Sequence, residues 1–402
     1  MLNSQALDDV AVAPAAAHST VAQPVYDIEI VAETDAMRAR LAAVYRDGFA
    51  TPFQTPEWIS AWYATVGIKR EAEPLLVFVT EHATGQAVMT LPLVRHRSDG
   101  LDVIDFADLG VTDYNAPILG PAAPASPEDF RALWERIVKA LPKADLVQLR
   151  KMPATIDGHP NPLVLLRGVS PSHSPGFSVR LPDEWDGYLQ TLGKKFRKEL
   201  GRSLRLFEKE GATAFNRIDT VSEAHSVLAV MNAQQRARLD EMGYAYVLEE
   251  DAYHAFYDGL ASEGLSSGST VLTTLTCDGA IVAALLGVTN GKSFAMVRLS
   301  HAGGDWMKIG PGRLVIERTM HALHATGCRH FDFSLGDYPY KSGFGVTPSP
   351  LLDFVAARSW RGRMKAARDL TKAAVKRGLK ACGVSLVPQS VKDRYRRYHA
   401  AS

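Results

Sequence analysis

The stretch TVLTTLTCDGAIVAALLGVTNGKSFAMVRLS, residues 270–300, decides the fold of this chain. It consists of three apolar runs separated by Asp278-Gly279 and Asn290-Gly291. Such pairs between β-rich runs are strong signals for two-residue hairpin turns, because these residues tolerate the positive φ angles that the turns require. The stretch therefore predicts an antiparallel meander with strands at 270–277, 280–289 and 292–300.

The segments on either side of the meander extend it into a lobe. A predicted helix at 312–326 leads to the strand HFDFSL at 330–335, and a strand–helix–strand unit usually places its two strands parallel. Before the meander, the sequence pattern predicts helices at 185–211 (with a break near Gly193), 222–239 and 251–263. The result is a mixed α/β sheet with helices on its faces.

The first half of the chain follows a similar plan. Thr55-Pro56 is a helix start signal within PFQTPEWISAWYATVG, residues 52–67. The further elements that we predict are hairpin strands at 74–80 and 86–97, a strand at 101–109, a helix at 127–140 and a strand at 144–150. The Pro- and Gly-containing stretch 168–177 separates the halves. We therefore predict two lobes, residues 26–170 and 177–355.

The composition is that of a globular protein, with 46% hydrophobic and 22% charged residues. No run reaches the ~18 apolar residues that span a bilayer. Residues 1–25, rich in Ala and Pro, are predicted to be disordered and do not resemble a signal peptide. The three cysteines lie far apart and predict neither a disulfide framework nor a zinc site. We expect a cytoplasmic protein without a metal ion.

The end of the chain, residues 356–402, is a predicted basic helical tail with 13 Lys/Arg and two acids. This charge favours an anionic partner, although a solvated helix packed on the body is the alternative. Arg358, Arg361 and Arg363 are closely spaced in RSWRGRMKAAR, residues 358–368. Because guanidinium groups stack on guanine and bind phosphate, they predict a site for a cyclic dinucleotide such as cyclic di-GMP, or for an anionic membrane surface.

A pair of glycines opens the predicted helix after the meander, in WMKIGPGRLVIERTM, residues 306–320. The first N–H groups of a helix lack internal partners, and glycine lets a phosphate approach them closely. A plain loop-to-helix connection is the alternative. The candidate phosphate-binding residues are Lys308, Ile309, Gly310, Gly312 and Arg313.

The segment FDFSLGDYPYKSGFG, residues 331–345, follows as a strand and a glycine-rich turn. Phe331 and Phe333 point to one side of the strand and Asp332 to the other, where it faces a cleft, an ion pair or a helix start. Lys341 lies beyond the strand end, where sites of open sheets gather. We expect it to neutralise a phosphate or to stabilise an oxyanion, with a flexible surface lysine as the alternative.

A basic stripe marks the helix around residue 200. Lys194, Lys198, Arg202 and Arg205 recur on one face. The stripe predicts contact with a sugar-nucleotide or lipid-linked pyrophosphate, and a solvated helix face is the alternative.

Several of these motifs resemble the acyl-CoA N-acyltransferase (GNAT) superfamily, which binds the CoA pyrophosphate at a glycine loop after the fourth strand. Met307 stands where the family pattern has Arg or Gln. Residues 331–345, together with PFQTPEWISAW and KKFRKELGRSLRLFEKEGA, are similar to CelD-like and FemABX-like acyltransferases of bacterial envelope and exopolysaccharide pathways. The matches span roughly residues 50–355 and imply two tandem acetyltransferase-type lobes, with the CoA site in the second.

The resemblance implies an acyl-CoA-dependent N-acetyltransferase that uses acetyl-CoA or another acyl-CoA. Its acceptor would be an amine of a sugar-nucleotide or lipid-linked glycan precursor. Lys341 matches an active-site lysine of FemABX-like enzymes. Asp332 and Asp337 are the candidate bases, and Tyr338 and Tyr340 are the candidate acids that protonate the leaving thiolate.

Two other functions are compatible with the same residues. One is a FemABX-like transferase that takes an aminoacyl group from tRNA, with the basic helix serving the RNA. The other is a non-catalytic binding protein on this scaffold, whose tail holds an anionic ligand at the inner face of the membrane.

Overall fold

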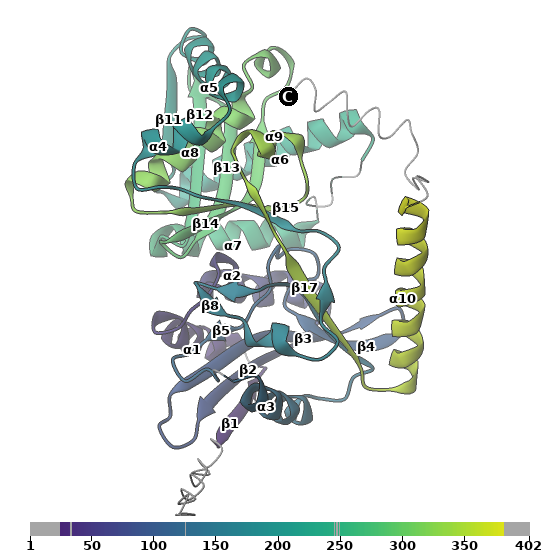
Figure 1. The fold of residues 1–402 in the computed structure, drawn as a ribbon. Helices are drawn as coiled ribbons and strands as arrows, with labels where there is room; N and C mark the ends of the chain where they lie inside the picture. Colours follow the sequence, from purple (N-terminus) through teal and green to yellow (C-terminus); the bar gives the residue numbers. More distant parts are fainter. Residues whose placement is uncertain are drawn as a thin grey trace, which may run out of the picture.

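The computed structural model describes residues 25–381, apart from residues 33, 125, 245, 247 and 249. Two lobes, each built on a mixed sheet with helices, lie one above the other in Figure 1. The predicted mixed α/β fold is confirmed. Nearly all of the predicted disordered segment, residues 1–25, and the end of the basic tail lie outside the described residues. Within the described part, no helix is long and apolar enough to cross a membrane.

The sheet of the first lobe has the strand order β1-β2-β3-β4-β6-β17-β9, with β5 paired to β3. Its only parallel pair among the described strands is β4 with β6. The elements up to its edge strand are β1 (Tyr26–Val31), α1 (Thr34–Arg46), α2 (Pro56–Trp62), β2 (Glu73–Glu81), β3 (Ala87–Ser98), β4 (Leu101–Phe106), β5 (Ile118–Leu119), α3 (Pro127–Ala140), β6 (Leu146–Pro153), the short hairpin β7 (Thr155–Ile156) and β8 (His159–Pro160), and β9 (Ser170–Pro171).

The sheet of the second lobe has the order β11-β12-β13-β14-β15-β10-β16. The predicted meander is its centre, and Asp278 and Gly279 adopt φ angles of +48° and +80° at the first turn. The elements are β10 (Gly176–Arg180), α4 (Trp185–Thr191), α5 (Lys194–Phe207), β11 (Thr213–Arg217), α6 (Val221–Met242), α7 (Asp251–Ser267), β12 (Thr270–Cys277), β13 (Ala280–Thr289), β14 (Ser293–His301), α8 (Pro311–Ala325), β15 (His330–Leu335), α9 (Pro339–Gly343) and β16 (Thr347–Ser349). β17 (Leu351–Ala357) and α10 (Trp360–Ala381) follow in the chain.

The two lobes exchange a strand. β10 directly follows the first lobe but pairs with β15, whereas β17 follows the second lobe and pairs with β6. Figure 1 shows β17 running from the upper lobe to the lower one. Phe354 of β17 packs on Trp134 of α3, with ring centroids 5.9 Å apart. The predicted end of the second lobe at residue 355 therefore needs correction, because β17 belongs to the first sheet.

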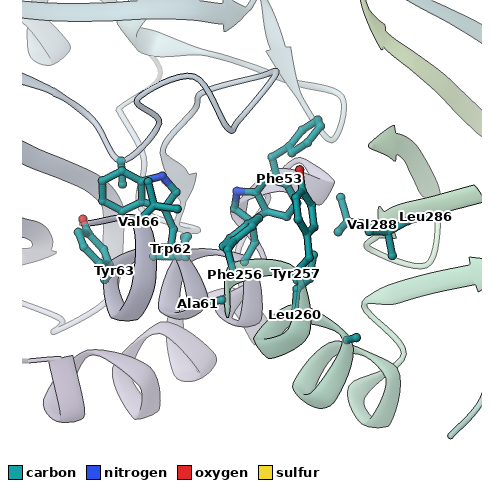
Figure 2. Close-up of a cluster of buried hydrophobic side chains, with 14 of the residues drawn as sticks. Phe53, Ala61, Trp62, Tyr63, Val66, Phe256, Tyr257, Leu260, Leu286 and Val288 are labelled. Carbon is teal, nitrogen blue, oxygen red and sulfur yellow. The ribbon is translucent and has the colours of Figure 1, made fainter. Parts of the chain in front are cut away.

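A shared hydrophobic core joins the lobes. Figure 2 shows α2 of the first lobe beside α7 of the second, with aromatic side chains between them. Trp58 and Phe256 meet edge to face, with ring centroids 4.9 Å apart. The Trp58 indole N–H donates to Thr112 Oγ1 at 3.1 Å. These contacts hold the loop that follows β4 against the second lobe.

Candidate active site

The central feature of the second lobe is the divergence of its two parallel strands. β14 and β15 pair only through Ser293–Ala295 and His330–Asp332, although both strands continue further. Beyond this point Ser334 adopts a φ of +61°, and its hydroxyl donates to the Met296 carbonyl at 2.6 Å. This bend breaks the regular ladder and lets the strands separate.

A cavity of about 780 Å³ lies at the divergence, and we call it the splay cavity. Both strands, the end of α6 and the turn after β15 contribute to its wall. Its lining includes the polar side chains Asp113, Gln235, Arg298, Tyr338, Tyr340 and Lys341. Such a concave site with a few polar groups is where a ligand binds in most proteins.

The glycine loop adjoins this cavity. α8 begins at Pro311 after Gly310, whose φ is +71°, and no side chain caps the helix start. A smaller cavity at Gly310, Gly312 and Arg313 shares Tyr340 with the splay cavity. The helix start therefore faces the same region as the strand divergence.

The other predicted residues of the glycine loop have different environments. Ile309 is only 1% exposed and belongs to the core, so its side chain is not available to a ligand. Lys308 is exposed and lies 3.8 Å from Asp305. Arg313 is part-buried and lies 3.6 Å from Glu199 of α5.

Lys341 is buried at the end of β15. Its side chain is 2% exposed, which excludes the alternative of a flexible surface lysine. The Nζ donates to the carbonyls of Ser334 at 3.1 Å and Leu335 at 2.8 Å. Burial lowers the pKa of the amine to about 8, while the carboxylates of Asp332 and Asp113 oppose this shift.

Asp332 is buried between the lobes. Its Oδ1 accepts from the Tyr114 hydroxyl and from the Ser334 N–H, both at 2.6 Å. Burial raises the pKa of this carboxyl to about 7, and the two hydrogen bonds oppose the rise. Asp332 lines a separate cavity of about 560 Å³, together with Tyr114. The structure thus brings this candidate base to the other lobe rather than to the splay cavity.

The remaining candidates lie in the turn after β15. Tyr338 and Tyr340 both line the splay cavity, with their rings stacked at a centroid distance of 6.1 Å. Tyr340 also lines the cavity at the glycine loop. Asp337 is exposed and does not line the splay cavity. Tyr340 is therefore the better placed of the predicted acids.

One carboxylate of the splay cavity was missed by sequence reasoning. Asp113 belongs to the loop after β4, in the first lobe, and its Oδ2 accepts from the Leu335 N–H at 3.5 Å. Burial raises the pKa of its carboxyl, while the charges of Lys151 and Lys341 oppose this. Leu335 lies 222 residues further along the chain, so no local pattern signals the contact.

The predicted basic surfaces lie away from the splay cavity. Lys194, Lys198 and Arg202 are exposed on α5. Arg358 donates to the Pro142 carbonyl at 3.2 Å and Arg361 to the Gly100 carbonyl at 2.8 Å. These two guanidinium groups contact separate loops of the first lobe, and Arg363 is exposed. Their roles in binding stay predictions.

Comparison with known proteins supports the predicted resemblance. Residues 194–342 match the family model of the acetyltransferase (GNAT) domain. The crystal structure of FemX aligns with a TM-score of 0.55 at 12% identity, covering 82% of this chain and 97% of FemX. No curated protein sequence matches the chain.

Two further solved structures align less closely, both at 12% identity. A tandem GNAT protein from the clavulanic acid biosynthesis pathway has a TM-score of 0.45, with 83% of this chain and 99% of that chain covered. The L-PGS of Bacillus licheniformis also has a TM-score of 0.45, with 84% and 96% covered.

The fold is that of a GNAT acyltransferase, with the family match centred on the lobe that holds the splay cavity. Its two-lobed arrangement is FemABX-like, as the alignment over nearly all of FemX shows. The resemblance inferred from the motifs is thereby confirmed at the level of fold.

Proposed function

We propose that this chain is an N-acyltransferase that moves an acetyl or other acyl group from acyl-CoA to an amine of an amino sugar or glycan precursor. The observation that supports this most is the divergence of β14 and β15 beside the glycine start of α8. The splay cavity of about 780 Å³ adjoins the smaller cavity at the glycine loop, so a donor bound at the start of α8 could reach an acceptor in the splay cavity in one direct-transfer complex.

The start of α8 fits the pyrophosphate of CoA. The N–H groups of Gly312 and Arg313 have no acceptor within the helix, and the positive end of the helix dipole lies there. A side chain at Gly310 would come within 2.9 Å of the Arg313 guanidinium, so glycine keeps this cation next to the helix start. When bound, acyl-CoA would supply a thioester as the acyl source.

Three residues of the splay cavity have separate roles in the proposed reaction. Asp113, whose pKa is raised by burial, would accept the proton of the acceptor amine. Lys341 would supply positive charge next to the negative charge that develops on the thioester oxygen. Tyr340, which lines both cavities, would protonate the leaving thiolate.

Calorimetry with acetyl-CoA tests the donor site. The wild-type protein is expected to bind, and Gly312→Asp is expected to bind about 10- to 100-fold more weakly, because the new carboxylate repels the pyrophosphate. Gly187→Asp is the matched control, since a Cβ at Gly187 makes only ordinary contacts at 3.7 Å. If the wild type does not bind acyl-CoA, the enzyme proposal fails in favour of a non-catalytic scaffold.

Transfer of an aminoacyl group from tRNA is the second candidate function. The exposed stripe Lys194, Lys198 and Arg202 on α5 favours it, because such a stripe can follow a phosphate backbone. A gel-shift titration with aminoacyl-tRNA tests this. Substituting the three residues with glutamine should weaken binding and flatten its salt dependence, whereas salt-independent or absent binding would exclude tRNA.

We also propose that α10 attaches the protein to an anionic membrane surface. Trp360 and Met364 lie one turn apart and are 65% and 64% exposed. Exposed basic side chains, Arg363 and Arg368, lie on the same helix. Vesicles with phosphatidylglycerol should capture the wild type, and Trp360→Ser should reduce capture. Binding of cyclic di-GMP without vesicle capture would instead favour the cyclic dinucleotide.

A further inference from the structure

Arg298 is a buried cation in the wall of the splay cavity. It lies on β14 and is 4% exposed. Its Nε donates to Gln235 Oε1 at 3.2 Å, and its Nη2 donates to Asn232 Oδ1 at 2.7 Å and to the Tyr246 hydroxyl at 2.9 Å. The guanidinium also lies over the Tyr257 ring, 4.6 Å from its centroid. Its position is thus fixed from several sides.

All of these partners are neutral. Within the described part of the chain, the Arg298 guanidinium forms no ion pair with a carboxylate. Amide and hydroxyl oxygens satisfy its hydrogen bonds without cancelling its charge. An uncompensated charge in a protein interior is costly, and a protein usually pairs it. The missing counter-charge is the first sign of a ligand.

The Nη1 end of the Arg298 guanidinium provides a second indication of a ligand. Hydrogen bonds to described residues involve Nε and Nη2 but not Nη1. Arg298 lines the splay cavity, and no described residue accepts a hydrogen bond from Nη1. Two N–H groups of a rigid, positively charged fork are therefore available to an oxygen ligand.

We infer that Arg298 is the subsite for an oxyanion of the acceptor, a carboxylate or a phosphate carried by the same molecule as the reacting amine. This inference rests on the proposed function for the assignment of the splay cavity to the acceptor. Asp113 and Lys341 line the same cavity and would face the amine end. A zwitterionic amino-sugar phosphate or amino-sugar acid fits this pattern, and a neutral amino sugar leaves Arg298 unpaired.

The test compares three amines and one ion on the wild-type protein by calorimetry. The ligands are glucosamine 6-phosphate, a 2-amino-2-deoxyuronic acid, glucosamine and inorganic phosphate. The phosphate or the carboxylate ligand should bind about 10- to 100-fold more tightly than glucosamine, as expected for a charge-assisted pair with arginine. The stronger of the two identifies the oxyanion.

Variants then assign the effect to one residue. Arg298→Met should reduce the affinity for the anionic amine to that for glucosamine, and Arg298→Lys should retain part of the preference. Arg46→Met, which removes an exposed arginine of α1, is the matched control and should change nothing. Circular dichroism and thermal unfolding identify a variant that fails to fold.

The outcomes separate this inference from the proposed function. Equal binding of anionic and neutral amines by the wild type overturns the inference even if Arg298→Met cannot be purified. Equal binding of phosphate and glucosamine 6-phosphate overturns the assignment to an acceptor, and the absence of all binding overturns the site. Failure to bind acetyl-CoA affects only the proposed transfer reaction, because the amine titrations contain no CoA.

Discussion

Substitution of Lys341 by methionine probes the buried amine at the end of β15. Burial lowers the pKa of this amine from 10.5 to about 8, so the charged form is disfavoured in the folded protein. That shift corresponds to about 3 kcal/mol. Methionine removes this penalty but leaves the Ser334 and Leu335 carbonyls without a donor, at ~1–3 kcal/mol each. The two effects oppose each other, so at pH 7 we expect a change between about 1 kcal/mol of stabilisation and about 3 kcal/mol of destabilisation.

The contribution of Lys341 to the free energy of unfolding changes with pH in a definite direction. Between pH 8 and 10.5 the unfolded chain keeps the Lys341 proton and the folded chain has lost it. The free energy of unfolding of the wild type therefore rises with pH through this window, and it lacks this contribution below pH 8. At pH 10 the gain from this group is about 2.5 kcal/mol. Lys341→Met has no such gain.

Urea unfolding followed by tryptophan fluorescence, at pH 7 and pH 10, measures the difference. Comparing wild type with variant at each pH cancels the titration of the other groups. Lys139→Met, an exposed lysine of α3, is the control and should follow the wild type. The reasoning is refuted if the wild type and Lys341→Met differ by the same amount at both pH values, because the amine would then not be desolvated.

Three further predictions concern the other residues that join the lobes. Asp113→Asn should lower kcat about 100- to 10,000-fold in a thiol-release assay. It should also abolish the acidic limb of the pH profile of kcat, because a carboxyl with a raised pKa is protonated as the pH falls and then cannot act as a base. An unchanged pH profile would exclude Asp113 as the base. Tyr114→Phe removes the 2.6 Å hydrogen bond to Asp332 and should cost ~1–3 kcal/mol in urea unfolding, whereas no loss would make that contact unimportant. Phe256→Ala should cost ~3–5 kcal/mol in one transition for both lobes, and separate transitions would argue against a shared core.

Local sequence signals predicted the meander and several helices, but they missed β1, β10, β11 and β17 and could not predict long-range strand partners. The Asp-Gly turn at residues 278–279 determines the β12–β13 hairpin within a few residues, and the predicted break near Gly193 separates α4 from α5. The strand Leu351–Ala357 has no local feature that selects one sheet over the other. Its partner β6 is decided by packing of Phe354 on a helix formed more than 200 residues earlier.

The predictions for the candidate site divide in the same way, between residues with a local sequence signal and residues placed by long-range contacts. The sequence located Lys341 and the glycines of α8, because a strand end and a helix start are visible in a short window. It did not predict the pairing of Asp332 with Tyr114, and it missed Asp113, since both contacts depend on a loop of the other lobe. Arg298 was also missed, because an arginine within an apolar strand has no signal of its own until its neutral surroundings are known.

The first lobe contains a related strand divergence, and the lysine in its cavity is paired with a carboxylate of the same lobe. β4 and β6 pair in parallel over Val103–Asp105 only, much as β14 and β15 do. The cavity at this position, about 330 Å³, contains Lys151 paired with Asp108 at 2.6 Å. The Lys151 cation of this cavity therefore has a counter-charge within the chain. In the splay cavity the hydrogen-bond partners of Arg298 among the described residues are neutral, in keeping with the inferred oxyanion subsite.

The starts of α3 and α8 differ in charge and in capping. The N-cap residue of α3 is Ser126, whose hydroxyl accepts from the Asp129 N–H, and Glu128 and Asp129 place two acids in its first turn. These groups satisfy a free donor and repel a pyrophosphate. α8 has Gly310 at its N-cap position, lacks a side-chain cap, and carries Arg313 in its first turn. Although the topology occurs twice, we expect CoA to bind at the start of α8 and not at that of α3. Calorimetry should therefore give one acetyl-CoA per chain, and a stoichiometry of two would contradict this expectation.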